Sequence, residues 1–122
     1  MIFETHAHYD DKMFDEDRES LLESMQEAGI GRIVNIGADL ASTASSIALA
    51  EKYPFIYAAA GVHPSDAAQL NEHTFQWLSE QTAHEKVVAV GEIGLDYYWE
   101  KDPEVRANQR YWFRRQLNLA RE

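Results

Sequence analysis

The chain is 122 residues long and 45% hydrophobic, and it carries 11 Lys and Arg against 21 Asp and Glu, for a net charge of −10. This length and composition suit one soluble globular domain, and with no apolar run that would cross a bilayer and no secretory leader we expect a cytoplasmic protein without membrane contact. The absence of cysteine excludes disulfides and thiolate metal ligands, and the acidic balance argues against a broad basic surface for a phosphate backbone.

Apolar runs and helical patterns alternate along the chain. Short strands are predicted over residues 2–6, 32–37, 55–60 and 86–90. Helices are predicted over 15–28, over 40–52, around 75–78 and from 102 to the end. In the last helix Phe113, Leu117 and Ala120 fall at helical spacing and mark an apolar face. Four strand–helix units in succession predict an α/β fold, a single domain over 1–122 with a parallel sheet covered by helices.

Two architectures fit this succession. One is the first half of a (β/α) TIM-type barrel, four of the eight units that take about 250 residues when complete. The other is an open, doubly wound sheet. No glycine-rich phosphate loop follows the first strand, which counts against the second. In both architectures the functional site lies at the C-terminal ends of the strands.

Polar side chains stand at those strand ends. His6 and His8 are two residues apart on the first strand, so their imidazoles face the same side and could share one metal ion or serve two. Asn35, His63 and Glu92 follow the second, third and fourth strands. We expect all five side chains to meet at one rim. The alternative for the histidine pair is a solvated or hydrogen-bonded pair without metal.

Glu92 is the most informative of these residues. It has the same parity as Val88 and Val90, so we expect its carboxylate to point to the face that those valines use. A carboxylate on an apolar interior is costly unless a cation or hydrogen-bond donors compensate it. Facing two histidines, it could bridge two metal ions. The alternative is a salt bridge to a lysine or arginine.

Three further features each have two interpretations. His63 could contact a phosphate or hydrogen-bond a ligand, or it is a structural loop residue. Asp96 either supports the metal site from behind or caps the loop that follows it. Tyr97, Tyr98 and Trp99 either stack on a nucleobase or form a hydrophobic rim.

Three motifs together resemble the TatD family of metal-dependent deoxyribonucleases. They are Thr5-His6-Ala7-His8, Gly61-Val62-His63-Pro64 and Gly91-Glu92-Ile93-Gly94-Leu95-Asp96-Tyr97. The resemblance covers all 122 residues in order and spacing. Glu4 and Ala7 stand where the family commonly has aspartate and cysteine, and neither change removes a ligand. Ser65 stands where a histidine often follows the proline of the second motif.

The resemblance implies a barrel of the metal-dependent hydrolase superfamily, in which His6, His8 and Glu92 bind metal and His63 contacts the substrate. It implies two divalent ions per complete site, Zn, Mn or Mg, with Glu92 as a bridging, catalytic ligand. The substrate implied is DNA, whose phosphodiester bonds are hydrolysed, and bound cations would make the acidic site locally positive. Further ligands, two histidines and an aspartate, come from later strands of the family's barrel, so the match is to its N-terminal half.

For the 122-residue chain itself the resemblance implies little or no nuclease activity, because half of the metal ligands would lie outside it. Unpaired edges of a half barrel would favour self-association with another copy. Two rival functions remain. One is a related metal-dependent hydrolase of small esters or amides, and the other is a non-catalytic scaffold fragment that keeps the fold.

Overall fold

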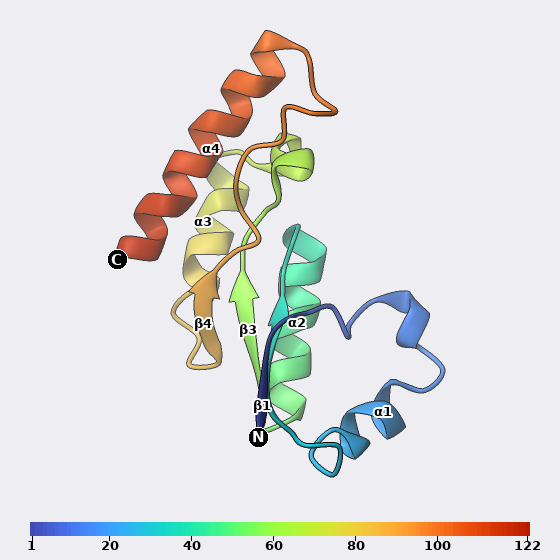
Figure 1. The fold of residues 1–122 in the computed structure, drawn as a ribbon. Helices are drawn as coiled ribbons and strands as arrows, with labels where there is room; N and C mark the ends of the chain where they lie inside the picture. Colours follow the sequence, from blue (N-terminus) through green and yellow to red (C-terminus); the bar gives the residue numbers. More distant parts are fainter.

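The structure is a computed structural model that describes all residues from 1 to 122. Its sheet has four parallel strands in the order β1 (Ile2–Ala7), β2 (Ile30–Ile36), β3 (Ile56–Ala60) and β4 (Val87–Val90). Every strand is hydrogen-bonded to the next one in the sequence, and Figure 1 shows β3 and β4 side by side. A doubly wound sheet reverses its strand order at a switch point, whereas a (β/α) barrel does not. The order is therefore that of four consecutive barrel units, as predicted.

The helices follow the strands in the expected succession. They are α1 (Arg18–Ser24), α2 (Leu40–Lys52), α3 (Glu72–Gln81) and α4 (Pro103–Arg121), with short 3-10 helices η1 (Lys12–Phe14) and η2 (Pro64–Gln69). None of them combines the length and the apolar character needed to cross a lipid bilayer.

Side-chain caps explain why α2 and α4 begin where the sequence predicted. The Asp39 carboxylate accepts a hydrogen bond from the Ser42 amide at 2.6 Å, and Ser42 returns the contact as a capping box. The Asp102 carboxylate accepts from the Glu104 amide at 2.8 Å, and Pro103 occupies the first turn.

The helix predicted over 15–28 is wrong at both ends, because α1 covers Arg18–Ser24 alone. The guanidinium group of Arg18 donates hydrogen bonds to the carbonyl oxygens of Tyr9 (2.6 Å) and Asp11 (2.7 Å). It thereby folds the chain after β1 back against the start of the helix. Residues 12–14 form η1 instead, so the acidic run that reads as a helix start lies in a turn.

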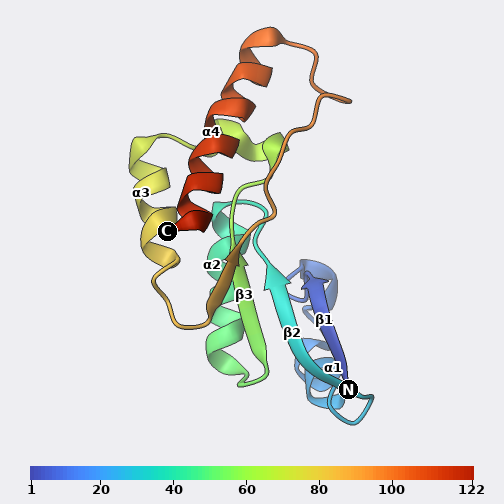
Figure 2. The same cartoon turned by 60° about the vertical axis from the view of Figure 1, so that its left-hand side comes forward.

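Two apolar clusters hold the helices to the sheet. One lies between α1, α2 and the sheet and is centred on Leu22, Ile33, Ile47 and Ile56. The other joins the end of β3 to η2, α3 and α4, and includes Val62, Leu78, Trp112 and Leu119. Figure 2 shows α2 beside β3, and α4 next to α3.

The apolar face predicted for the last helix is wrong by about one residue. Trp112, Gln116 and Leu119 are buried, whereas Leu117 is exposed. Trp112 packs against Phe75 of α3, with ring centroids 5.5 Å apart. Packing of this large aromatic decides which side of α4 turns inward.

The predicted alternation along β4 is also wrong. Ala58 pairs with Val87 and Ala59 with Ala89, so Val88 is an extra residue that interrupts the register. Val87 and Val90 both pack on the helix side, and Val88 is 55% exposed. The face that Glu92 reaches is therefore not the apolar interior that strand parity predicted.

Candidate metal centre

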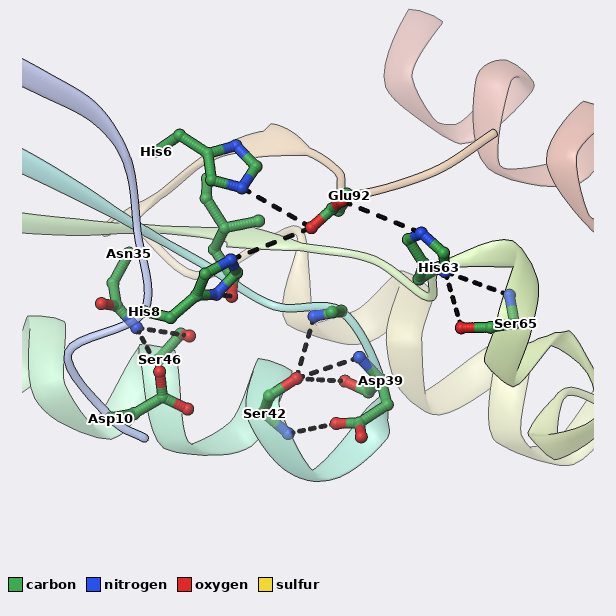
Figure 3. Close-up of polar contacts among 12 residues, drawn as sticks. His6, His8, Asp10, Asn35, Asp39, Ser42, Ser46, His63, Ser65 and Glu92 are labelled. Carbon is green, nitrogen blue, oxygen red and sulfur yellow. Dashed lines mark hydrogen bonds and ion pairs between the residues drawn. The ribbon is translucent and has the colours of Figure 1, made fainter. Parts of the chain in front are cut away.

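Three side chains converge at the C-terminal ends of β1 and β4. His6 and His8 come from the end of β1, and Glu92 follows β4 by two residues. The Glu92 Oε2 atom lies 3.6 Å from His6 Nε2 and 3.9 Å from His8 Nε2 (Figure 3). No lysine or arginine pairs with this carboxylate, so the salt-bridge alternative is wrong.

The donor set fits a divalent cation. One ligand atom from each of His6, His8 and Glu92 lies within 4.8 Å of the other two. Ligand atoms bound to one ion at about 2.1 Å lie roughly 3.0–3.4 Å apart, so the three side chains are near that arrangement and would draw together when they bind an ion. Two imidazole nitrogens with a carboxylate oxygen suit Zn²⁺, Mn²⁺ or Mg²⁺ better than a metal that prefers sulfur.

Backbone hydrogen bonds beyond the strands hold this rim together. The Gly91 amide donates to the Ala60 carbonyl at 3.0 Å, and the Glu92 amide donates to the Gly37 carbonyl at 2.8 Å. The His63 amide donates to the Ala38 carbonyl at 2.7 Å. The segments after β2, β3 and β4 are thereby bonded to one another, which fixes where Glu92 and His63 leave the sheet. The Gly91–Glu92 peptide bond is cis.

Gly61 permits the closest of these approaches. A Cβ atom at position 61 would lie 2.7 Å from the carbonyl carbon of Gly91 and 2.8 Å from its oxygen. Both neighbours are backbone atoms, which cannot rotate away as a side chain can. Only glycine at position 61 allows the chain after β3 to lie this close to the residue before Glu92.

A backbone carbonyl orients one of the two histidines. The Nδ1 atom of His8 lies 3.1 Å from the Ile36 carbonyl oxygen, which can only accept a hydrogen bond. Nδ1 of His8 therefore carries the proton, and the lone pair on Nε2 is free to face Glu92 and a metal ion. A contact of this kind is the usual brace of a metal-binding histidine. His6 has no such contact at its ring.

His63 presents a different chemistry to Glu92. Its Nδ1 accepts a hydrogen bond from the Ser65 amide at 3.1 Å and lies 2.7 Å from the Ser65 hydroxyl. In the neutral ring the proton is then on Nε2, which lies 3.9 Å from Glu92 Oε1. His63 thus offers an N–H donor rather than a metal-binding lone pair, on the oxygen that His6 and His8 do not face.

Two buried polar side chains hold the segment that carries His63. The Gln116 side chain accepts from the Val62 amide at 2.8 Å and donates to the Val62 carbonyl at 3.2 Å. The Thr43 hydroxyl donates to the Gly61 carbonyl at 3.1 Å. Sequence reasoning missed Gln116, although a polar residue on the same stripe of α4 as Trp112 is a detectable signal.

Asn35 does not join the site, and its predicted place at the rim is wrong. Its side chain is fully buried and points away from the histidines (Figure 3). It accepts from the Tyr9 amide at 2.7 Å and donates to Asp10 and to Ser46 at 2.8 Å each. A buried amide must satisfy its hydrogen bonds, and Asn35 does so by fastening the chain just after His8.

Asp96 is a loop cap. Its Oδ1 atom accepts from the amides of Tyr98 (3.1 Å) and Trp99 (3.4 Å). No hydrogen bond or ion pair joins it to Glu92 or to a histidine. The structure therefore favours a cap of the following loop over support of the metal site.

The site is open to water. The side chains of His6, His8, Glu92 and His63 are 53%, 44%, 36% and 30% exposed. Beside them, burial and then the charge of Glu4 raise the pKa of Tyr9, so its phenol stays protonated. The polar surface is thus built from imidazoles and a carboxylate that solvent and a substrate can reach.

Comparison with known proteins gives a consistent result. The family model described as TatD related DNase matches residues 3–122. The chain is 43% identical to the uncharacterized metal-dependent hydrolase YabD of Bacillus subtilis over 122 residues, which are all of this chain and 47% of that protein. It is 31% identical to the 3'-5' ssDNA/RNA exonuclease TatD of Cronobacter sakazakii over 121 residues, 99% of this chain and 45% of that protein.

Solved structures of TatD-family proteins also match this chain. The crystal structure of YJJV, a TatD homologue from Escherichia coli, is 36% identical with a TM-score of 0.83, over 98% of this chain and 46% of that one. A TatD family hydrolase from Entamoeba histolytica, 24% identical with a TM-score of 0.84, supports the fold alone. The chain spans about half the length of the curated relatives that it matches. On the family match and these relatives, the chain belongs to the TatD-related DNase family of metal-dependent hydrolases.

Proposed function

We propose that this chain supplies the first part of the active site of a cytoplasmic, metal-dependent hydrolase that cleaves phosphodiester bonds in single-stranded DNA. The convergence of His6, His8 and Glu92 within 4.8 Å supports this proposal most directly. The donor N–H of His63 beside them suits a phosphate oxygen. The exonuclease name of the Cronobacter relative supports the choice of substrate.

Each side chain has a distinct part in the proposed mechanism. His6, His8 and Glu92 would hold divalent metal, two ions in the complete site. When bound, the metal would supply Lewis-acid chemistry that activates water and offsets negative charge on the phosphate. His63 would donate a hydrogen bond from Nε2–H to a non-bridging phosphate oxygen and so hold the phosphorus in position for attack by water. The Ile36 carbonyl keeps the His8 lone pair toward the ion.

Metal binding by the chain tests the first half of the proposal. Calorimetric titration with Zn²⁺ or Mn²⁺ should show one ion bound per chain. Glu92→Gln removes the charged ligand with little change in shape, and we expect affinity to fall by about a hundredfold or more, since losing even a supporting contact costs about 10–100-fold. Glu85→Gln is the matched control, because Glu85 is an exposed residue just before β4. Equal affinity in Glu92→Gln and Glu85→Gln would contradict the proposed site.

A chimera tests the reaction. Residues 1–122 would replace the matched segment of the Bacillus subtilis relative, which is 43% identical. The folded, metal-loaded chimera should shorten a labelled single strand, and a Glu92→Gln chimera should not. Bis(4-nitrophenyl) phosphate, a diester without a base, serves as a second substrate. A chimera that hydrolyses small carboxylic esters or amides but neither diester would favour the rival hydrolase.

The chain alone is also proposed to associate with a second copy. β1 and β4 each pair with one neighbour, so each leaves one side of its backbone free. Ile2, Phe3 and Val88 on these strands are exposed. Unpaired edges with apolar side chains favour pairing with another chain. Because all four strands are parallel, β4 of one copy can pair with β1 of another copy in the same direction.

A further inference from the structure

The loop after β4 carries the most exposed aromatic pair of the molecule. Tyr98 is 74% and Trp99 81% exposed, and their rings meet edge to face with centroids 4.6 Å apart. In Figures 1 and 2 the chain between β4 and α4 runs beyond the strand ends before α4 returns beside α3. Large aromatic side chains exposed together mark a place where something binds.

This loop is held in place. Besides the contacts from the Asp96 carboxylate, the buried Gln109 side chain accepts from the Asp96 amide at 2.9 Å and donates to its carbonyl at 3.1 Å. Arg106 donates to the carbonyls of Glu100 (2.7 Å) and Tyr97 (3.0 Å) and stacks on the Tyr97 ring at 4.6 Å. The backbone that carries the two exposed rings is therefore held before a ligand arrives, which lowers the entropy cost of binding.

A cleft lies between the loop and the segment that follows His63. It has a volume of about 310 Å³ and its lining includes Trp99 and Val105 on the loop side, Pro64, Ser65 and Ala67 on the other, and the acidic Asp96 and Glu100. Ser65 is the residue that hydrogen-bonds His63. A ligand whose phosphate lies at His63 can thus place its next group in the cleft and against Trp99.

Cations from the start of the last helix lie among acidic residues at this place, since Asp96 and Glu100 line the cleft. Residues 101–122 hold six of the eleven lysines and arginines and only three of the twenty-one acidic residues. The preceding hundred residues are strongly acidic. Lys101 and Arg110 lie around the loop, with Lys101 Nζ 5.9 Å from the Tyr98 ring and Arg110 donating to the Tyr97 hydroxyl at 2.8 Å. Aromatic rings next to cations are the usual means of binding single-stranded nucleic acid.

We infer that Tyr98 and Trp99 form a stacking platform for a base of the single strand, next to the phosphodiester at His63 and Glu92. This inference rests on the proposed function and names how the strand is held. Stacking on an aromatic side chain is tolerant of sequence, since every base has a flat face. We therefore expect the platform to distinguish a strand with bases from one without, but not one base from another.

The test is fluorescence anisotropy of the 122-residue chain with labelled oligodeoxythymidylate and with an abasic strand of equal length, in chelator so that neither is cut. The wild type should bind the base-bearing strand more tightly. Trp99→Ala should weaken that binding by roughly tenfold, leave abasic binding unchanged, and be rescued by Trp99→Phe. Tyr111→Ala, which removes an exposed aromatic ring from α4, is the control and should change neither affinity.

Three results would overturn the platform. They are equal binding of the two strands by the wild type, an unchanged affinity in Trp99→Ala, and a Trp99→Ala effect on sedimentation rather than on strand binding, which would make the rings a protein interface. The proposed function stands or falls separately, on hydrolysis of bis(4-nitrophenyl) phosphate by the chimera. That substrate has no base to stack.

Discussion

His63 touches Glu92 through a different carboxylate oxygen from the one that faces His6 and His8. Because its ring proton is on Nε2, it should serve the substrate and not the metal. We predict that His63→Ala leaves metal affinity unchanged within about twofold while weakening the binding of inorganic phosphate by about tenfold, the cost of one hydrogen bond to a charged group. Calorimetry of the metal-loaded chain measures both constants.

His63→Gln provides the complementary variant, because its amide can still donate a hydrogen bond. Phosphate binding should recover in part. If His63→Ala lost metal and phosphate affinity together, the histidine would be a ligand after all, and the proton assignment made from the Ser65 contact would be wrong.

At this scale, the sequence identified the residues whose chemistry is unusual and missed those that brace them. The convergence of His6, His8 and Glu92 could be predicted because the C-terminal ends of parallel strands meet at one edge of the sheet, whereas their binding of metal stays a prediction. Asn35 could not be placed, because its position in the chain does not tell which side of the sheet its side chain takes. The protonation of His63 depends on a contact from Ser65, which needs coordinates.

Among the elements, β2 fixes the loop after β1 through one side chain. Asn35 makes three hydrogen bonds with no solvent exposure. Asn35→Ala leaves the Tyr9 amide and the Oδ1 atom of Asp10 without their partner, and we predict a loss of about 1–3 kcal/mol in the free energy of unfolding. Urea denaturation measures it. Ser45→Ala, which removes an exposed contact to Asp10, should cost less than about 1 kcal/mol.

A salt bridge joins α3 to α4. Two guanidinium hydrogen bonds from Arg115, at 2.7 and 3.1 Å, hold the pKa of Glu72 below its ordinary value of 4.5. A carboxyl group whose pKa is lowered by folding stabilises the fold at pH values above its pKa in the unfolded chain. This stabilisation is lost as the pH falls through the lower pKa of the folded protein. We predict that the Tm difference between wild type and Glu72→Gln is present at pH 7, begins to shrink below pH 4.5 and vanishes once the pH is below the lowered pKa of Glu72. A pH-independent difference would exclude ionisation as its cause.

Some element boundaries can be predicted from local sequence patterns and others cannot. α2 and α4 could be predicted because their caps are contacts between residues close in the sequence. The start of α1 could not, because Arg18 bonds to carbonyls seven to nine residues earlier. The bulge at Val88 arises from the pairing of β4 with β3, so no period within β4 alone could reveal it.

For the whole molecule, the unpaired edges of β1 and β4 make association the expected state of the chain in solution. We predict that sedimentation velocity shows a species larger than a monomer at high concentration. Val88→Lys places a charge on the edge strand, where lysine blocks pairing, and should shift the chain toward monomer. Leu117→Lys, an exposed residue of α4, is the control. A wild type that stays monomeric would refute the edge argument.

The rate of DNA cleavage also depends on the whole molecule. The candidate metal ligands are 36–53% exposed, so the chain alone neither excludes water from the site nor confines a substrate there. It should therefore bind metal yet cleave single-stranded DNA far more slowly than the chimera does, a comparison that the same labelled strand provides.

The close approach of Gly61 to Gly91 affects how measurements on variants of this protein are interpreted. A methyl group there would press on the backbone of Gly91, and Gly61 is itself buried between Ala60 and Val62 of the second apolar cluster. The substitution Gly61→Ala should therefore lower the free energy of unfolding as well as the metal affinity. A weakened grip on the cation in that variant has to be compared with its denaturation curve before it is assigned to the rim.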